Sequence, residues 1–404
     1  MALAFRLRSL QIAAAAIFLY AGCDKNPIVD DGNPSPREPA TLPVLGQGEV
    51  FTRYSAEVAA RDRWVYTTSW GRRLADGNAL YIWDAQGSAP VLTDTVIVPL
   101  ASTLGDVQIS DDGTLLVVAT ERTNGSIIIF DRTQPDHPVQ LARYSSPDTD
   151  RGVHTVKLGR VDGRLYAFLS IDPNPAQLVI LDISDPANPT PVLARVMGNS
   201  LHHDVFVRDG LLFTALWNVG LSIWDIGGGG KGGSPANPVL IGNVRTVNGH
   251  VHNIWWYHAA DGSKRYVFVG EESPPFALGI ISTGDIHVVD ISNIEQPREV
   301  AYYTVPGAGT HNFTMDETAG VLFAAYYNAG VRALDVRGDL GSCTAAARNT
   351  DGRCDLGLAG REAGFALTSG SPPVSVWGVA RVGSILYASD MLNGLFKIDI
   401  ASLK

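Results

Sequence analysis

Four histidines occupy one repeated position in this chain, and imidazole is the side chain that proteins use most often to bind transition metals. Each is followed by one polar and one apolar residue, as in His203-Asp204-Val205. They are four of the nine histidines of the chain: His154, His203, His252 and His311. Three further units carry Glu57, Asp106 and Gly378 at what the hydrophobic pattern aligns as the same point, so folding of the unit does not require histidine there.

The ligand type alone does not name the metal, because imidazole suits Zn, Cu, Fe and Ni. Carboxylates are expected nearby to accept a hydrogen bond from the second ring nitrogen and so orient each imidazole. The candidates for this role are Glu57, Asp106, Asp204 and Glu272. An alternative remains open: a histidine at a strand entry can bond the backbone of the next unit, and its recurrence then reflects repetition alone.

The units that position these histidines are marked by an apolar strand that ends in Asp. In the clearest copy, Gln177–Pro189, consecutive apolar residues lead into Asp182 and an Asp-Pro-Ala-Asn-Pro turn follows. Uninterrupted apolar runs are typical of strands buried on both faces. The copies end at Asp84, Asp131, Asp182, Asp225, Asp290, Asp335 and Asp399. Units of roughly 40–50 residues with four strands each are typical of a β-propeller.

Seven units predict seven blades, and the two ends of the chain predict how the ring closes. The last unit stops at Lys404, directly after its third strand. The segment Leu42–Gly46 resembles Asn237–Gly242, the fourth strand of a middle unit. The sequence therefore predicts an all-β fold: one seven-bladed β-propeller of four-stranded antiparallel blades over residues 43–404, closed by the N-terminal strand. In such a ring the inner strands surround an axis, so the four histidines should meet at one mouth of the channel.

These motifs carry a family resemblance. The stretch Leu-Val-Ile-Leu-Asp-Ile-Ser-Asp-Pro-Ala-Asn-Pro, ending at Pro189, resembles the LVIVD-repeat propellers of bacterial surface proteins. Asn328–Asp335 and Asn393–Asp399 resemble the last repeats of the choice-of-anchor B group. The resemblance covers about residues 43–404 and implies the propeller fold on a bacterial surface. It implies no particular reaction.

Residues 1–22 have the pattern of a signal peptide of the lipoprotein type. Arg6 and Arg8 precede an apolar stretch, Leu10–Tyr20, that is too short to span a bilayer. Ala-Gly-Cys follows and resembles a lipobox ending at Cys23, although Tyr20 stands where an aliphatic residue is usual. Residues 23–42 contain four prolines and are predicted to be a tether. Ordinary secretion with cleavage near Ala21 is the alternative.

The other two cysteines, Cys343 and Cys354, lie in a polar insertion. Outside the cytoplasm this spacing predicts a disulfide that closes a loop. A metal pair or a redox dithiol is the alternative, although neither has supporting histidine or Cys-x-x-Cys spacing. The formal net charge of −10 disfavours nucleic-acid binding. We expect a monomer.

Two classes of function fit these features. The first is a membrane-tethered extracytoplasmic propeller, in the periplasm or on the outer surface, that binds a ligand or protein partner through its top face. The second is a metal-dependent enzyme using Cu, Fe or Zn, with an axial four-histidine centre and an oxidoreductase among the options. Carotenoid-cleaving oxygenases and selenium-binding methanethiol oxidases are similar to this arrangement in fold and in ligand type only. The chain has no nucleophile elbow and no His-Glu-x-x-His motif, so no catalytic residue is assigned.

The lipobox pattern predicts that Cys23 becomes the lipidated N-terminus of the mature protein. Cys23→Ser should move the protein from the membrane fraction to the soluble fraction, because a polar tether without a lipid offers no stable anchor. Fractionation of both proteins expressed in a bacterial host measures this. Wild-type protein that is already soluble would contradict the prediction.

Overall fold

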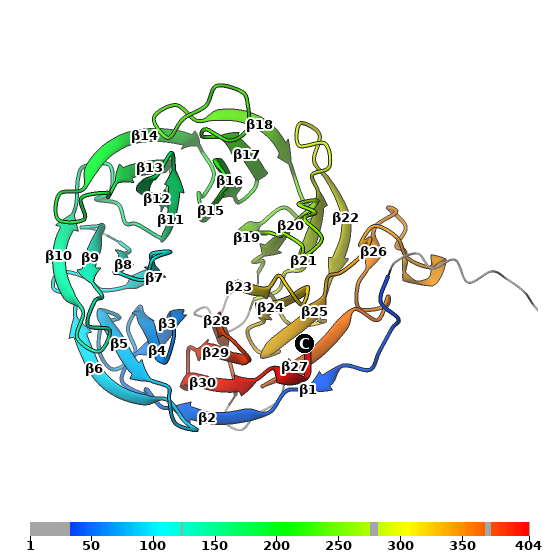
Figure 1. Ribbon diagram of the computed structural model, residues 1–404, viewed down its shortest axis with the longest axis horizontal. Coiled ribbons are helices and arrows are strands. Elements are labelled where there is room, and N and C mark those ends of the chain that lie inside the picture. The colour runs from blue at the N-terminus through cyan, green and yellow to red at the C-terminus, as the bar shows by residue number, and fades with distance from the viewer. Residues whose placement is uncertain (1–32, 123, 275–281, 368–372, 404) are drawn as a thin grey trace, which may run out of the picture.

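Seven β-sheets stand around a central axis in the computed structural model, which describes residues 33–122, 124–274, 282–367 and 373–403 (Figure 1). Blade one is β3(Tyr54–Arg61), β4(Trp64–Trp70), β5(Ala79–Asp84), β6(Val91–Ile97). Blade two is β7(Leu104–Ile109), β8(Leu115–Thr120), β9(Ser126–Asp131), β10(Val139–Tyr144). Blade three is β11(Thr155–Val161), β12(Arg164–Ile171), β13(Ala176–Asp182), β14(Thr190–Gly198). Blade four is β15(Asp204–Arg208), β16(Leu211–Leu216), β17(Gly220–Asp225), β18(Val239–Val244).

The last three blades contain the additional strands. Blade five is β19(Val251–Trp256), β20(Tyr266–Glu271), β21(Ile286–Asp290), β22(Arg298–Tyr303) with β26(Cys354–Asp355). Blade six is β23(Phe313–Asp316), β24(Val321–Ala325), β25(Val331–Asp335), β27(Glu362–Ala366) with β1(Ala40–Thr41). Blade seven is β28(Val376–Val382), β29(Ile385–Asp390), β30(Gly394–Asp399) with β2(Val44–Gly48). Two short 3-10 helices, Ala345–Ala347 and Ala401–Leu403, complete the described elements. The predicted all-β, seven-bladed propeller is confirmed.

The repeated Asp residues end the third strand of each blade by capping the turn that follows. In every copy one carboxylate oxygen accepts a hydrogen bond from the backbone N–H two residues further on. In Asp182, for example, the bond from the Ser184 N–H is 2.9 Å long. This is the Asx-turn that Asp favours, because its short side chain reaches its own backbone. The seven Asp residues therefore serve the fold.

The N-terminal strand closes the ring as the sequence predicts. β2 is the outer strand of blade seven and pairs antiparallel with β30, with Val44 opposite Ile398 and Gly48 opposite Leu395. A Cβ on Gly48 would lie 2.4 Å from the Trp83 ring of blade one, so only glycine allows this close approach. Closure covers the outer edge of β30, which would otherwise be unpaired.

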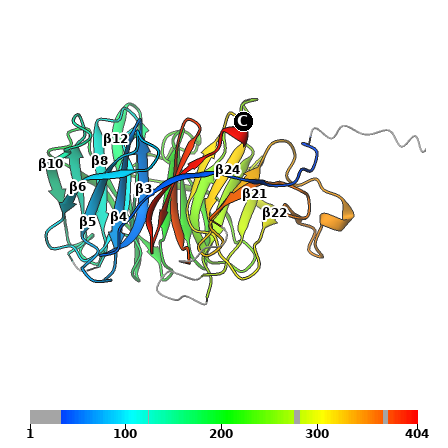
Figure 2. The ribbon, with the colours of Figure 1, turned by 90° about the horizontal axis from the view of Figure 1, so that it is seen from below.

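The last part of the predicted tether, residues 33–42, contacts the ring. β1 pairs in parallel with β27, Leu42 is only 2% exposed, and Asn33 accepts a 2.7 Å hydrogen bond from the Asp339 N–H. Figure 2 shows this segment running along the outside of the ring. The physical reason is that β27 would otherwise present an open edge, and Leu42 would otherwise be exposed. The predicted signal peptide and Cys23 lie outside the described residues.

The polar insertion folds back onto blade five. A disulfide joins Cys343 to Cys354, as the sequence predicts, and β26 pairs in parallel with β22. The neighbouring Arg353 forms an ion pair with Glu299 of β22. Among the residues that the structure describes, no helix has the length and apolarity to cross a membrane.

Two leucines of the N-terminal segment test whether it belongs to the fold. Leu42→Ala should lower the free energy of unfolding by about 2–5 kcal/mol, because it leaves a cavity in the core. Leu45→Ala should change it by less than about 0.5 kcal/mol, since Leu45 is 41% exposed. Urea denaturation of both variants measures the difference, and equal stabilities would contradict the docking of this segment.

Candidate metal centre

The four histidines form an arc at one mouth of the central channel, which we call the top face. His252 lies in β19, and the other three stand just before β11, β15 and β23. Successive ring centroids, in the order His154, His203, His252 and His311, are 4.1, 4.1 and 4.2 Å apart. Residues from four consecutive blades are thereby brought into van der Waals contact, as expected from their common repeat position.

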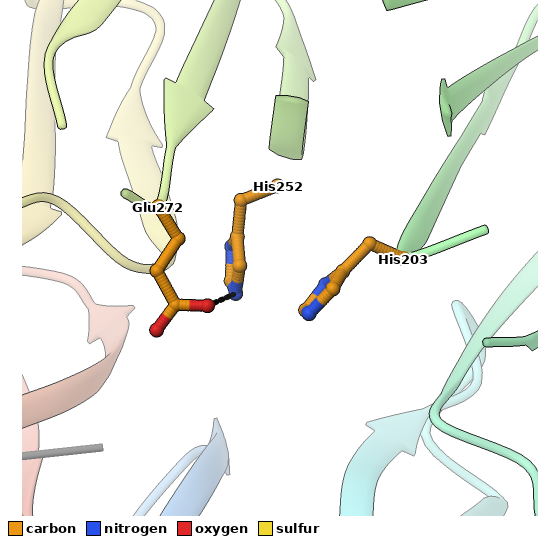
Figure 3. A group of neighbouring side chains, drawn as sticks. All are labelled: His203, His252 and Glu272. Atoms are coloured by element: carbon orange, nitrogen blue, oxygen red, sulfur yellow. Dashed lines mark ion pairs between the residues drawn. The ribbon is translucent and has the colours of Figure 1, made fainter. Parts of the chain in front are cut away.

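Three side chains in this group are arranged as a metal-binding set: His203, His252 and Glu272 (Figure 3). One ligand atom from each lies within 4.8 Å of the other two. Glu272 follows β20 and is positioned by a 3.1 Å hydrogen bond from its N–H to the His250 carbonyl. Ligands at ~2.0–2.2 Å from one tetrahedral ion lie about 3.3–3.6 Å apart, so these side chains would have to approach one another by up to about 1 Å to complete the set.

The inner two histidines have ring nitrogens without hydrogen-bond partners among the described residues. These atoms are Nδ1 of His203 and both ring nitrogens of His252. His203 and His252 are 7% and 2% exposed, so water does not satisfy these atoms freely. The His252 Nε2 atom lies 3.7 Å from Oε2 of Glu272, too far for a hydrogen bond. A buried polar atom left unpaired costs about 1–3 kcal/mol, and a bound cation would remove that cost.

The outer two histidines are held by other partners. Nδ1 of His154 lies 3.1 Å from Oε1 of Glu121, and Nδ1 of His311 donates a 2.8 Å hydrogen bond to the Trp377 carbonyl. Neither histidine belongs to the three-residue set. The four-histidine metal site stays a prediction, and the geometry favours His203 and His252 together with Glu272, which the sequence assigned to an orienting role.

The electrostatics keep the inner histidines neutral. Burial lowers the pKa values of His203 and His252 well below the usual range, and neighbouring imidazoles add to the effect. Neutral imidazole is the form that binds a metal. Burial alone would lower the pKa of His154, but the Glu121 carboxylate raises it to about 10. Burial raises the pKa of Glu272 to about 7, although a hydrogen bond from Tyr327 opposes this shift.

Apart from Glu272, the carboxylates predicted to orient the imidazoles lie deeper in the channel. Glu57, Asp106 and Asp204 line a cavity of about 80 Å³ together with Thr155, Asn253 and Asn312. Asp106 accepts a 3.0 Å hydrogen bond from the Val156 N–H, and Asp204 one of 2.8 Å from the Val205 N–H. Burial raises the pKa values of all three carboxyls. Only Glu57 comes near a histidine, at 3.6 Å from Nδ1 of His311.

The predicted alignment of Glu57, Asp106 and Gly378 with the four histidines is wrong by one residue. Judged by their partners on the second strands, Asp106 and Gly378 are equivalent to Asp204, the residue after the histidine. The residues at the histidine position in the other three blades are thus Ala56, Gly105 and Trp377. The apolar residues Val58, Val107 and Val379 do align with Val205, but each histidine stands two residues before this apolar residue, whereas Glu57, Asp106 and Gly378 stand only one before it.

Two acidic residues at the top face were missed in the sequence. Glu121 follows β8 and Asp172 follows β12, the position that Glu272 holds after β20. Both contribute to the raised pKa of His154. The signal that could have found them is this shared place after each second strand.

The top face is thus defined as a propeller channel mouth lined by histidines, carboxylates and the aromatic residues Trp217, Tyr327 and Trp377. Comparison with known proteins assigns the repeat: residues 167–194 and 202–246 match the LVIVD repeat. The chain is thus a seven-bladed β-propeller that contains LVIVD repeats in blades three and four. None of the curated proteins matches it significantly.

Solved structures share its fold at low sequence identity. Sqt1 of Saccharomyces cerevisiae is 10% identical with a TM-score of 0.56, over 90% of this chain and 87% of that one. The β-propeller domain of Myceliophteria thermophila Cps50 (Swd1) is 11% identical with a TM-score of 0.58, over 88% of this chain and 99% of that one. These similarities concern the fold alone.

A buried charge network supports the strand end that carries Glu272. His287 of β21 is fully buried between two carboxylates, with Nε2 3.1 Å from Glu271 and Nδ1 2.7 Å from Glu299. Burial alone would lower the pKa of His287, but Glu271 and Glu299 raise it to about 9. Arg353 of the disulfide-closed insertion completes the network at Glu299.

This network predicts a pH dependence of stability. Because the folded pKa of His287 lies above its unfolded value, its stabilisation is complete below about pH 6.5 and is lost as the pH rises through about 9. His287→Gln should therefore destabilise the protein by on the order of 3 kcal/mol at pH 6, and by much less at pH 10. Thermal unfolding of both proteins across this range measures the effect; a difference independent of pH would contradict it.

Proposed function

We propose that this protein is an extracytoplasmic β-propeller, tethered to a bacterial membrane, that binds its ligand at the top face through a transition metal. The β-propeller fold itself is consistent with a protein-interaction module. The observation that carries the finer proposal is the group of buried, unpartnered nitrogens of His203 and His252 beside the Glu272 carboxylate. A set of two imidazoles and one carboxylate suits Zn, Cu or Fe.

A metal-dependent enzyme is the second candidate, and the number of ligands favours it. Three protein ligands leave a coordination position open, as in catalytic zinc sites with two histidines and one glutamate. A metal there would act as a Lewis acid on a bound group. The chain itself supplies the walls: Trp217 lies against His203 at 5.2 Å and Trp377 against His311 at 4.4 Å between ring centroids.

The docked N-terminal segment limits how far the propeller can stand from its anchor. If Cys23 is lipidated, residues 24–32 separate it from Asn33, which contacts the ring through Asp339. Nine residues span at most about 30 Å in an extended conformation. Had residues 24–41 of the predicted tether all been free, these eighteen residues would have allowed about 50 Å. The proposal thus holds the ring close to the membrane, with the tether attached beyond the end of β25, on the side of the ring opposite the top face.

Metal analysis of the purified protein tests the proposal. Wild type reconstituted with Zn²⁺ or Cu²⁺ should bind one equivalent, measured by mass spectrometric metal analysis after desalting. His203→Ala and His252→Ala should each weaken binding at least about 100-fold, because each removes one of three ligands. His137→Ala is the matched control, since His137 is exposed on the outside of the ring. Equal metal contents in all four proteins would refute the site.

A further inference from the structure

We propose that Tyr327 positions Glu272, so that Glu272 presents a single oxygen atom to the metal. This inference rests on the proposed function and names a residue outside the ligand set. Tyr327 belongs to blade six, whereas Glu272 belongs to blade five. Its hydroxyl donates a hydrogen bond across the blade boundary to Oε1 of Glu272.

The backbone of Tyr327 is held in a strained conformation. Its φ angle is 38°, in the left-handed region that bulky residues rarely adopt. Such a conformation costs about 1–3 kcal/mol and persists only where the surroundings enforce it. Here two hydrogen bonds to Val376 of blade seven enforce it, with the Tyr327 N–H donating at 3.1 Å and the carbonyl accepting at 3.0 Å. Strain maintained in this way is typical of functional sites.

The side chain is fixed as firmly as the backbone. Tyr327 is fully buried, and its ring lies 5.3 Å from the His311 ring and 6.1 Å from the Trp377 ring, both edge-on. With the ring locked, the hydroxyl has one direction in which to donate. It therefore determines the orientation of the Glu272 carboxylate.

The consequence for metal binding follows from the two carboxylate oxygens. Oε1 is occupied by the Tyr327 hydroxyl, while Oε2 faces the His252 Nε2 atom at 3.7 Å. A one-oxygen carboxylate with two imidazoles suits Zn²⁺ or Cu²⁺. Ca²⁺ prefers six to eight oxygen ligands and often a carboxylate that binds through both atoms. Tyr327 thus favours a transition metal over Ca²⁺ at this site.

The adjacent Tyr326 offers a matched control. It is also fully buried, but its hydroxyl lies 3.3 Å from the Gly284 carbonyl and from the Val305 N–H, within the packing between blades five and six. Replacing either tyrosine with phenylalanine removes one buried hydroxyl and keeps the ring. Of the two tyrosines, only Tyr327 donates a hydrogen bond to Glu272.

Two variants and a double-variant cycle test the role. Tyr327→Phe should weaken Zn²⁺ binding about 10–100-fold, the usual effect of losing a group that orients a ligand, whereas Tyr326→Phe should change it less than about twofold. The visible absorption spectrum of bound Co²⁺ should change in Tyr327→Phe, because Glu272 is then free to bind through both oxygens. In a Glu272→Gln background, adding Tyr327→Phe should have no further effect on affinity, since the hydroxyl acts through that carboxylate.

The outcomes separate this inference from the proposed function. Wild type that binds neither Zn²⁺ nor Co²⁺ would refute the metal site and the inference with it. Wild type that binds both, with Tyr327→Phe unchanged in affinity and in Co²⁺ spectrum, would refute the positioning role alone. An equal loss of affinity from Tyr327→Phe in the Glu272→Gln background would also refute it. Should Tyr327→Phe fail to fold while Tyr326→Phe folds, the hydroxyl serves stability and the positioning role is again refuted.

Discussion

The pairing of β2 with β30 is the constraint on which the rest of the structure depends. It joins the first described strands of the chain to the last, and a closed ring forces every inner strand to begin at the same mouth of one channel. Successive histidines, separated by 49, 49 and 59 residues in sequence, thereby have ring centroids only 4.1–4.2 Å apart. The centre at the top face is a consequence of ring closure, and no local motif could assemble it.

The same mouth combines unpaired buried nitrogens with a strained backbone angle. Buried nitrogens of His203 and His252 lack partners, and Tyr327 holds a left-handed backbone angle. At the opposite end of the blades, by contrast, the seven Asp caps accept hydrogen bonds from the turns that follow them. Unpaired polar atoms and backbone strain gathered at one place, beside carboxylates from neighbouring blades, are typical of a binding site that needs its ligand to be complete.

The sequence predicts the architecture well because the blade is specified locally. The apolar third strand, its Asp and the turn after it recur seven times, and Leu42–Gly46 repeats a fourth strand, so blade number and closure follow. The contributions of Ala40–Thr41 and Cys354–Asp355 were not predicted, since parallel pairing of two residues to an outer edge leaves no periodic signal. For the site, the histidines were found by position, but Glu57 and Asp106 were aligned one residue off. A hydrophobic pattern aligns the apolar residues of the inner strands, but it does not show which polar residue before them stands at the mouth, nor that Glu272 faces His252 there.

The central claim is that His203, His252 and Glu272 share one transition-metal ion at the top of the channel. Anomalous X-ray scattering from crystals of the Zn²⁺-loaded protein, collected on both sides of the zinc absorption edge, tests it most directly. The account predicts a single strong peak about 2.0–2.2 Å from a nitrogen of each histidine and from one oxygen of Glu272. An empty mouth in fully loaded crystals, or a peak held by other side chains, would contradict it.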